Sequence, residues 1–121
     1  MREAKNNSSN LGKKGEDFAC KFLVRQGYKI LKRNYRSKYA EIDLVAQVDD
    51  ILVFVEVKTR RSARYGLPEE AVNTKKIEKI KMAAYYYIQM EKPKTNKYRI
   101  DVVSIVVDKN ENVSAHIIQT G

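Results

Sequence analysis

The stretch VFVEVKTR, residues 53–60, decides the fold predicted for this chain. Its β-branched and aromatic residues are typical of a strand, and the side chains of a strand alternate between its two faces. Glu56 and Lys58 therefore share one face, whereas Val55 and Val57 share the other. A carboxylate is costly to bury among apolar neighbours unless it is paired or binds a metal. Glu56 is thus either half of a structural ion pair with Lys58 or part of a cation site.

The residues before this strand predict that it forms a β-hairpin with a second carboxylate. Residues 41–48 and 51–58 are both rich in β-branched side chains and are separated by two aspartates suited to a turn. The hairpin brings Asp43 toward Glu56, and two carboxylates repel each other unless a divalent cation lies between them. Ligands that are all oxygen favour Mg²⁺ or Mn²⁺ over zinc. The alternative role for Asp43 is a turn or strand-end hydrogen bond.

The other elements are predicted from periodicity. Apolar residues at helical spacing predict a helix that begins at Leu11 and is ended by Gly27, and a later helix for which Thr74 offers the N-cap. Further strands are predicted at residues 28–31, 98–107 and 113–118. A strand, a helix and another strand usually form a right-handed parallel crossover. The prediction is an α/β protein with a central mixed β-sheet flanked by helices, in the order α-β-β-β-α-β-β.

Charge indicates a polyanionic partner. The chain has 24 Lys and Arg against 15 Asp and Glu, a net charge of +9, which favours nucleic acid. Residues 41–57 contain five acids and no base, so the predicted carboxylate site is flanked by basic segments. For any one base the alternative is a solvated surface charge. The residues predicted to contact nucleic acid are Arg36, Arg60, Arg61, Arg64, Lys75, Lys76 and Lys79.

Length and composition exclude several other classes of protein. The 121 residues are expected to form one domain over residues 11–121, preceded by a flexible basic and polar tail over residues 1–10. The longest apolar run, residues 82–88, is too short to span a membrane, and the N-terminus has no export signal, so a cytoplasmic protein is expected. One cysteine and one histidine provide neither a disulfide nor a structural zinc site.

Several short motifs together resemble a known family. They are GxxGE at residues 12–16, NYR at 34–36, EIDLV at 41–45, FVEVKTR at 54–60, AV at 71–72 and DVV at 101–103. This combination resembles the bacterial YraN-type family, which is similar to restriction-endonuclease-like, or PD-(D/E)xK, nucleases close to archaeal Holliday-junction resolvases. The chain departs from the pattern at Ala40, where the family usually has glycine, and at Ile42, where the broader superfamily often has proline.

The resemblance implies roles for four residues. Asp43 and Glu56 would ligate a metal, Glu16 from the first helix would complete the site, and Lys58 would orient or activate the attacking water. The implied core is restriction-endonuclease-like, and the implied cofactor is Mg²⁺ with Mn²⁺ as a substitute. Glu16 has an alternative role as a solvated acid near the start of its helix.

Three functions are compatible with these patterns. The first is a Mg²⁺-dependent endodeoxyribonuclease that hydrolyses phosphodiester bonds in branched or structured DNA, with Asp43, Glu56 and Lys58 as catalytic residues; resolvase-like proteins suggest a homodimer. The second is a non-catalytic nucleic-acid-binding module of the same fold that acts with a partner protein. The third, a small ribosome-associated protein, explains the charge but not the carboxylates. Tyr35 and Tyr39 either stack on unpaired bases or pack in the core, and Tyr85, Tyr86 and Tyr87 are equally ambiguous.

Overall fold

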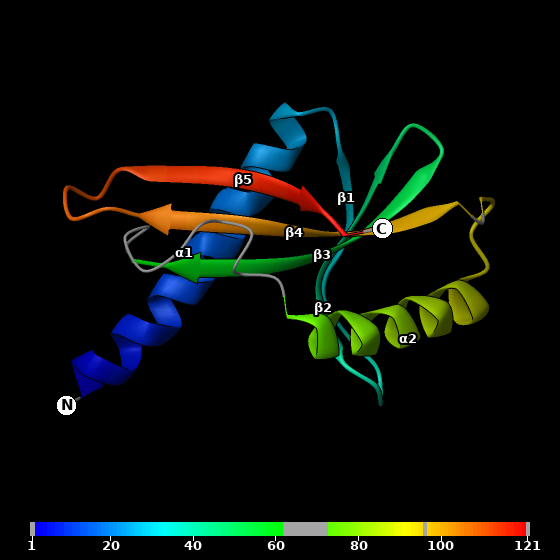
Figure 1. The fold of residues 1–121 in the computed structure, drawn as a ribbon, viewed down its shortest axis with the longest axis horizontal. Coiled ribbons are helices and arrows are strands. Elements are labelled where there is room, and N and C mark those ends of the chain that lie inside the picture. Colours follow the sequence, from blue (N-terminus) through cyan, green and yellow to red (C-terminus); the bar gives the residue numbers. More distant parts are fainter. Residues whose placement is uncertain (1, 62–72, 96, 121) are drawn as a thin grey trace.

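The computed structural model describes residues 2–61, 73–95 and 97–120. Its elements follow the predicted order (Figure 1). They are α1 (Arg2–Arg25), β1 (Lys29–Arg36), β2 (Glu41–Val48), β3 (Ile51–Arg60), α2 (Thr74–Glu91), β4 (Tyr98–Val107) and β5 (Val113–Gln119). Across the described ranges, neither helix combines the length and the apolar character that crossing a membrane requires.

All five strands belong to one mixed sheet in the order β1-β2-β3-β4-β5. β2 and β3 form the predicted antiparallel hairpin, and β3 pairs in parallel with β4, with Glu56 opposite Val102. β1 and β5 pair antiparallel with β2 and β4 and form the two edges. The chain leaves β3, passes through α2 and returns to β4, as the predicted parallel crossover requires. The α/β class with a mixed sheet is therefore confirmed.

Each helix covers a different face of the sheet. On one face, α2 buries Ile77, Ile80 and Tyr87 against Phe54 of β3. On the other, Ala19 and Leu23 of α1 pack against β2, β3 and β4. Figure 1 shows α1 crossing behind β3, β4 and β5, while α2 lies beside β2 and β3. The two apolar clusters hold β3 in the middle of the molecule, so the residues of β3 can meet side chains from both helices.

Three predicted boundaries are corrected. β1 extends to Arg36 instead of ending near residue 31, because its polar residues still pair with β2 while Ile30, Leu31 and Tyr35 pack inward. α1 begins at Arg2, ahead of the apolar pattern that indicated a start at Leu11, because the backbone hydrogen bonds of a helix do not require apolar periodicity. Whether residues 1–10 behave as a flexible tail stays a prediction.

The third correction concerns the start of α2. The N-cap is Asn73 instead of Thr74, because the Asn73 side-chain oxygen accepts a hydrogen bond from the Lys76 backbone N–H at 3.1 Å. This is the bond that an N-cap side chain makes to the third helical residue. The predicted end of α1 is confirmed, since Gly27 has φ 95°, a left-handed conformation that glycine adopts without strain.

Gly15 sets how closely α1 approaches β3. A Cβ atom on Gly15 would lie well within the contact limit of the Thr59 side chain. Gly12, one turn earlier, has no atom within 4 Å of such a Cβ. A side chain at position 15 would therefore push α1, and with it Glu16, away from the sheet.

We expect Gly15→Ala to lower the free energy of unfolding by about 1–3 kcal/mol, the usual cost of overpacking. Gly12→Ala is the matched control and is expected to raise it by about 0.5–1 kcal/mol, because alanine favours a helix interior. Urea unfolding followed by circular dichroism measures both variants. Equal effects of the two substitutions would contradict the close contact between α1 and β3.

Candidate functional site

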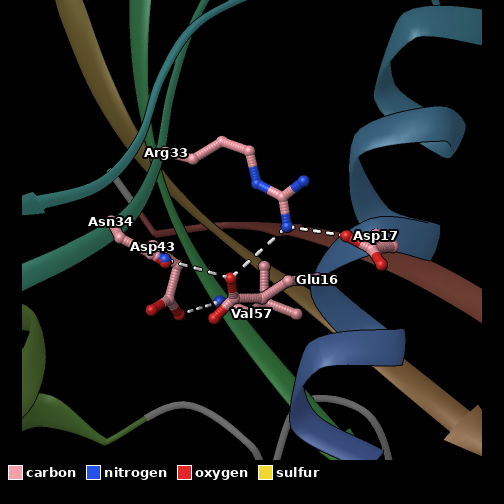
Figure 2. Close-up of polar contacts among 6 residues, drawn as sticks. All are labelled: Glu16, Asp17, Arg33, Asn34, Asp43 and Val57. Carbon is pink, nitrogen blue, oxygen red and sulfur yellow. Dashed lines mark hydrogen bonds and ion pairs between the residues drawn. The ribbon is translucent and has the colours of Figure 1, made fainter. Parts of the chain in front are cut away.

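The site lies where β2 and β3 separate. The two strands pair from Val48 opposite Ile51 to Leu44 opposite Val55, and beyond that point the Asp43 side chain takes the place of a backbone partner. The Val57 backbone N–H donates to Asp43 Oδ2 at 2.8 Å (Figure 2). Ile42 packs on the α2 face of the sheet and Leu44 on the α1 face. Residues two apart in a regular strand share a face, so the alternation of side chains in β2 is broken at Asp43. The chain thereby turns a carboxylate into the opening between the strands.

Glu56 supplies the second carboxylate of the site. It is only 6% exposed, and its Oε2 atom lies 2.5 Å from Nζ of Lys76, which projects from α2. Its Oε1 atom is buried and has no hydrogen-bond partner among the described residues. A buried acceptor without a donor is costly. The ion-pair partner of Glu56 is Lys76, and Lys58 instead lies exposed to solvent.

The surroundings favour the protonated form of Asp43. The pKa of this carboxyl is raised from 3.8 to about 7, chiefly by burial, and the hydrogen bond from Val57 opposes that change. The neighbouring Glu56 carboxylate, and more weakly Glu16, contribute to the same rise. The predicted approach of Asp43 to Glu56 is therefore present in the structure. A cation between the two carboxylates would remove this repulsion.

Glu16 approaches the same site from α1 but has partners of its own. Its Oε1 atom accepts a hydrogen bond from Asn34 Nδ2 at 3.2 Å and lies 3.7 Å from Arg33, which also pairs with Asp17 at 2.8 Å (Figure 2). Asn34 holds a left-handed conformation, φ 54°, that directs its side chain toward α1. Burial raises the Glu16 pKa, and Arg33 opposes the rise.

The three predicted metal ligands thus lie in one region, but they do not converge on a single point. Within residues 2–61, 73–95 and 97–120, no three His, Cys, Asp or Glu side chains are arranged to hold a metal ion together. Asp43 and Glu56 form a close pair, whereas Glu16 is turned to Arg33 and Asn34. The pair alone fits a hard divalent cation, because both ligands are carboxylates and the buried Glu56 Oε1 has a vacant lone pair.

Basic residues of α2 face this carboxylate pair. An open cavity of about 490 Å³ is lined by Tyr39, Ala40, Glu41, Asp43, Asn73, Lys75, Lys76 and Lys79. The three lysines lie in the first two turns of α2, where the positive end of the helix dipole disfavours cations. No acid occupies the first turn of α2 to compensate. This local conflict is resolved if an anion enters the cavity.

The other predicted contacts for nucleic acid are more dispersed. Arg36 pairs with Glu41 at 3.1 Å and lines a neighbouring cavity that also contains Glu16. Arg61 instead pairs with Glu111 at 2.6 Å, beside the β4–β5 end of the sheet. Arg60 is half-buried at the end of β3, and Arg64 lies outside the described residues.

Sequence reasoning missed Asn73 and Glu41 as residues that line the site. An asparagine directly before a helical pattern is a recognised N-cap signal, and it identifies Asn73 as readily as Thr74. Glu41 shares the EID motif with Asp43, but its ion pair with Arg36 depends on the β1–β2 pairing. The Lys76–Glu56 contact joins two separate elements, and the sequence pattern carries no signal for it.

Fold and site together define a small α/β protein in which a buried and a half-buried carboxylate lie at the opening between two antiparallel strands of a mixed sheet. Residues 15–105 match the uncharacterised protein family UPF0102, and the chain belongs to this family. The predicted membership of the YraN-type family is thereby confirmed.

Relatives match over almost the whole chain. The UPF0102 protein of Syntrophomonas wolfei is 48% identical over 108 residues, which cover 89% of this chain and 94% of that protein. The UPF0102 proteins of Dictyoglomus thermophilum and Caldicellulosiruptor saccharolyticus are 45% and 43% identical, over 88% and 93% of this chain and 91% and 97% of their own lengths.

Proposed function

We propose that this protein is a metal-dependent nuclease that hydrolyses phosphodiester bonds in branched or structured DNA. The observation that carries the proposal is the buried Glu56, whose Oε1 atom has no partner in the described chain and which lies beside a second carboxylate, Asp43. A buried carboxylate beside a half-buried one destabilises a fold unless a cation offsets the charge, so the pair is typical of a functional site. We propose also that the sheet and its helices form a restriction-endonuclease-like core, and that the protein acts as a homodimer, as resolvase-like proteins suggest.

The donor set supports Mg²⁺ or Mn²⁺ as the cofactor. Asp43 and Glu56 would hold the ion, and Glu16 would join them only after exchanging its contacts with Arg33 and Asn34. When bound, such an ion lowers the pKa of water and offsets the charge that develops on the phosphate. The Val57 N–H fixes the Asp43 carboxylate in the opening between the strands.

The basic groups of the site would place the phosphodiester. Lys75 and Lys79 line the cavity opposite Asp43, where they can contact the phosphates on either side of the scissile bond. Lys58 follows Glu56 on the same face of β3 and is exposed to solvent, a position suited to orienting the attacking water. Lys76, paired with Glu56, would hold the site neutral until a cation binds.

The proposal predicts metal-dependent cleavage that requires Glu56. Purified protein is incubated with labelled linear duplex, single-stranded, flap and four-way-junction DNA in Mg²⁺, Mn²⁺ or EDTA. We expect cleavage only with metal, and a loss of at least about a hundredfold for Glu56→Gln, which removes the charge but keeps the shape.

A matched control excludes contaminating nucleases. Glu91→Gln carries the same substitution on an exposed glutamate at the last residue of α2, away from the site, and is expected to cleave as the wild type does. Equal cleavage by Glu56→Gln would contradict the site. Binding of DNA without cleavage under any metal would instead favour the second candidate, a non-catalytic nucleic-acid-binding module, for which the Lys76–Glu56 ion pair is the supporting observation.

A further inference from the structure

An exposed aromatic surface adjoins the candidate site. It consists of Tyr39 from the β1–β2 turn and Met82, Tyr85 and Tyr86 from α2. Tyr85 is 64% exposed and Met82 50% exposed, whereas Tyr39 and Tyr86 are half-buried. The rings of Tyr39 and Tyr86 meet edge to face, with centroids 6.3 Å apart. A shallow cavity of about 250 Å³ runs between Tyr39, Met82 and Tyr85, and the ion pair of Lys81 with Glu78 completes its lining.

Only part of this surface belongs to the core: the half-buried Tyr39 packs against the apolar cluster under α2, whereas Met82 and Tyr85 are exposed. Among the consecutive tyrosines of α2, only Tyr87 is buried, and its ring contacts Phe54 at 5.5 Å and Tyr35 at 5.1 Å between centroids. Tyr35 and Tyr87 thus complete the apolar cluster under α2. Tyr85 and Met82 point away from that cluster, and exposing them brings no packing energy. Large apolar side chains gathered on a surface are typical of a binding site.

Tyr39 is held in place before any ligand binds. The Ser37 hydroxyl accepts hydrogen bonds from the backbone N–H groups of Tyr39 and Ala40, at 3.1 and 3.3 Å, and donates to the Ala40 carbonyl at 3.1 Å. The Ser37 N–H also donates to that carbonyl. This closed turn fixes the backbone that carries the ring, so the protein loses little backbone entropy when a base stacks on Tyr39.

Tyr39 connects the aromatic surface to the carboxylates. It lines both the shallow cavity and the larger one that contains Asp43, Lys75 and Lys79. The ammonium of Lys38 lies 5.3 Å from the centre of the Tyr39 ring. Aromatic rings beside a row of cations match a chain of flat bases on a phosphate backbone.

We infer that the aromatic surface binds unpaired bases, and that the substrate is therefore DNA with a single-stranded segment next to the phosphate that enters the carboxylate site. The bases stack on Tyr39 and Tyr85, while the phosphates follow Lys75 and Lys79 toward Asp43 and Glu56. This inference rests on the proposed function. A blunt duplex keeps its bases stacked on each other and gains only the phosphate contacts.

The test measures binding without catalysis. Anisotropy titrations in EDTA compare a fluorescent single strand with a blunt duplex of equal length, and 2-aminopurine in the strand reports stacking by loss of its fluorescence. We expect the single strand to bind more tightly, Tyr39→Leu and Tyr85→Leu each to weaken that binding about tenfold, and Tyr39→Phe to retain it. Duplex binding should change little in any of these variants.

Tyr98→Leu is the matched control, because Tyr98 is 44% exposed but lines neither cavity. Its affinity for single strands should equal that of the wild type. Equal affinity for both DNA forms, or unchanged binding and 2-aminopurine quenching in Tyr39→Leu and Tyr85→Leu, would overturn the inference. So would a homodimer that Tyr85→Leu dissociates, because a second copy of the chain would then cover the surface.

The inference about the ligand and the proposed nuclease activity can be rejected independently. Stacking measured in EDTA, together with absence of cleavage in Mg²⁺ and Mn²⁺, would retain the inference about the ligand and reject the nuclease. Cleavage that depends on Glu56 but shows no preference for unpaired bases would do the reverse.

Discussion

Asp43→Asn is expected to stabilise the metal-free protein at pH 8 and to abolish cleavage. Burial, followed by the charge of Glu56, raises the Asp43 pKa from 3.8 to about 7, so ionising this carboxyl disfavours the folded state. Asparagine has the same shape, carries no charge and can still accept the hydrogen bond from Val57. The gain in unfolding free energy should be about 2 kcal/mol after allowing for solvent screening.

The pH dependence follows from the direction of the shift. Because the folded-state pKa is the higher one, the folded protein binds more protons than the unfolded chain between pH 3.8 and about 7. The stability of the wild type relative to Asp43→Asn therefore falls as pH rises through this window and is constant above it. Thermal unfolding from pH 4 to 8 measures the difference.

Asp50→Asn is the control for this prediction. A hydrogen bond from Lys97 lowers the pKa of the exposed Asp50 carboxyl, so neutralising it should not raise the melting temperature at any pH. Parallel melting curves for the wild type and Asp43→Asn across the pH range would contradict the buried repulsion. Mn²⁺ should raise the melting temperature of the wild type, more strongly above pH 7 as the cation displaces the proton, but not that of Asp43→Asn.

The fold could be predicted from the sequence to the extent that its signals are local. The hairpin of β2 and β3, the parallel crossover to β4 and the end of α1 at Gly27 each follow from periodicity or from one residue's conformational preference. β1 was predicted too short because its polar half has no apolar alternation. Its strand conformation depends on pairing with β2, which periodicity does not report.

The carboxylates could be predicted more fully than their partners. Asp43 and Glu56 are marked by their apolar neighbours in the sequence. The broken alternation of side chains at Asp43 and the ion pair of Glu56 with Lys76 arise only when β2 parts from β3 and α2 packs over the sheet. A lysine two residues from Glu56 in sequence is therefore not the lysine that contacts it, since neighbours on one face of a strand point outward in parallel.

The exposed Lys58 and the ion-paired Lys76 should therefore respond differently to the same substitution. Lys58→Met is expected to lower the cleavage rate by about a hundredfold or more with the melting temperature unchanged, because Lys58 is exposed and, in the proposed function, orients the attacking water. Lys76→Met should lower the unfolding free energy of the metal-free protein by about 1 kcal/mol, because the buried Glu56 loses its partner.

The two lysine variants should also differ in their affinity for Mn²⁺. Hydrogen bonding to Glu56 raises the pKa of Lys76, so the ammonium on Oε2 and a cation at Oε1 repel each other on the same carboxylate. Lys76→Met should therefore bind Mn²⁺ more tightly than the wild type by calorimetry, whereas Lys58→Met should bind it equally. If Lys76→Met instead abolishes cleavage with Mn²⁺ affinity unchanged, and Lys58→Met cleaves normally, the lysine that serves the reaction comes from α2, and the strand motif supplies only the carboxylate.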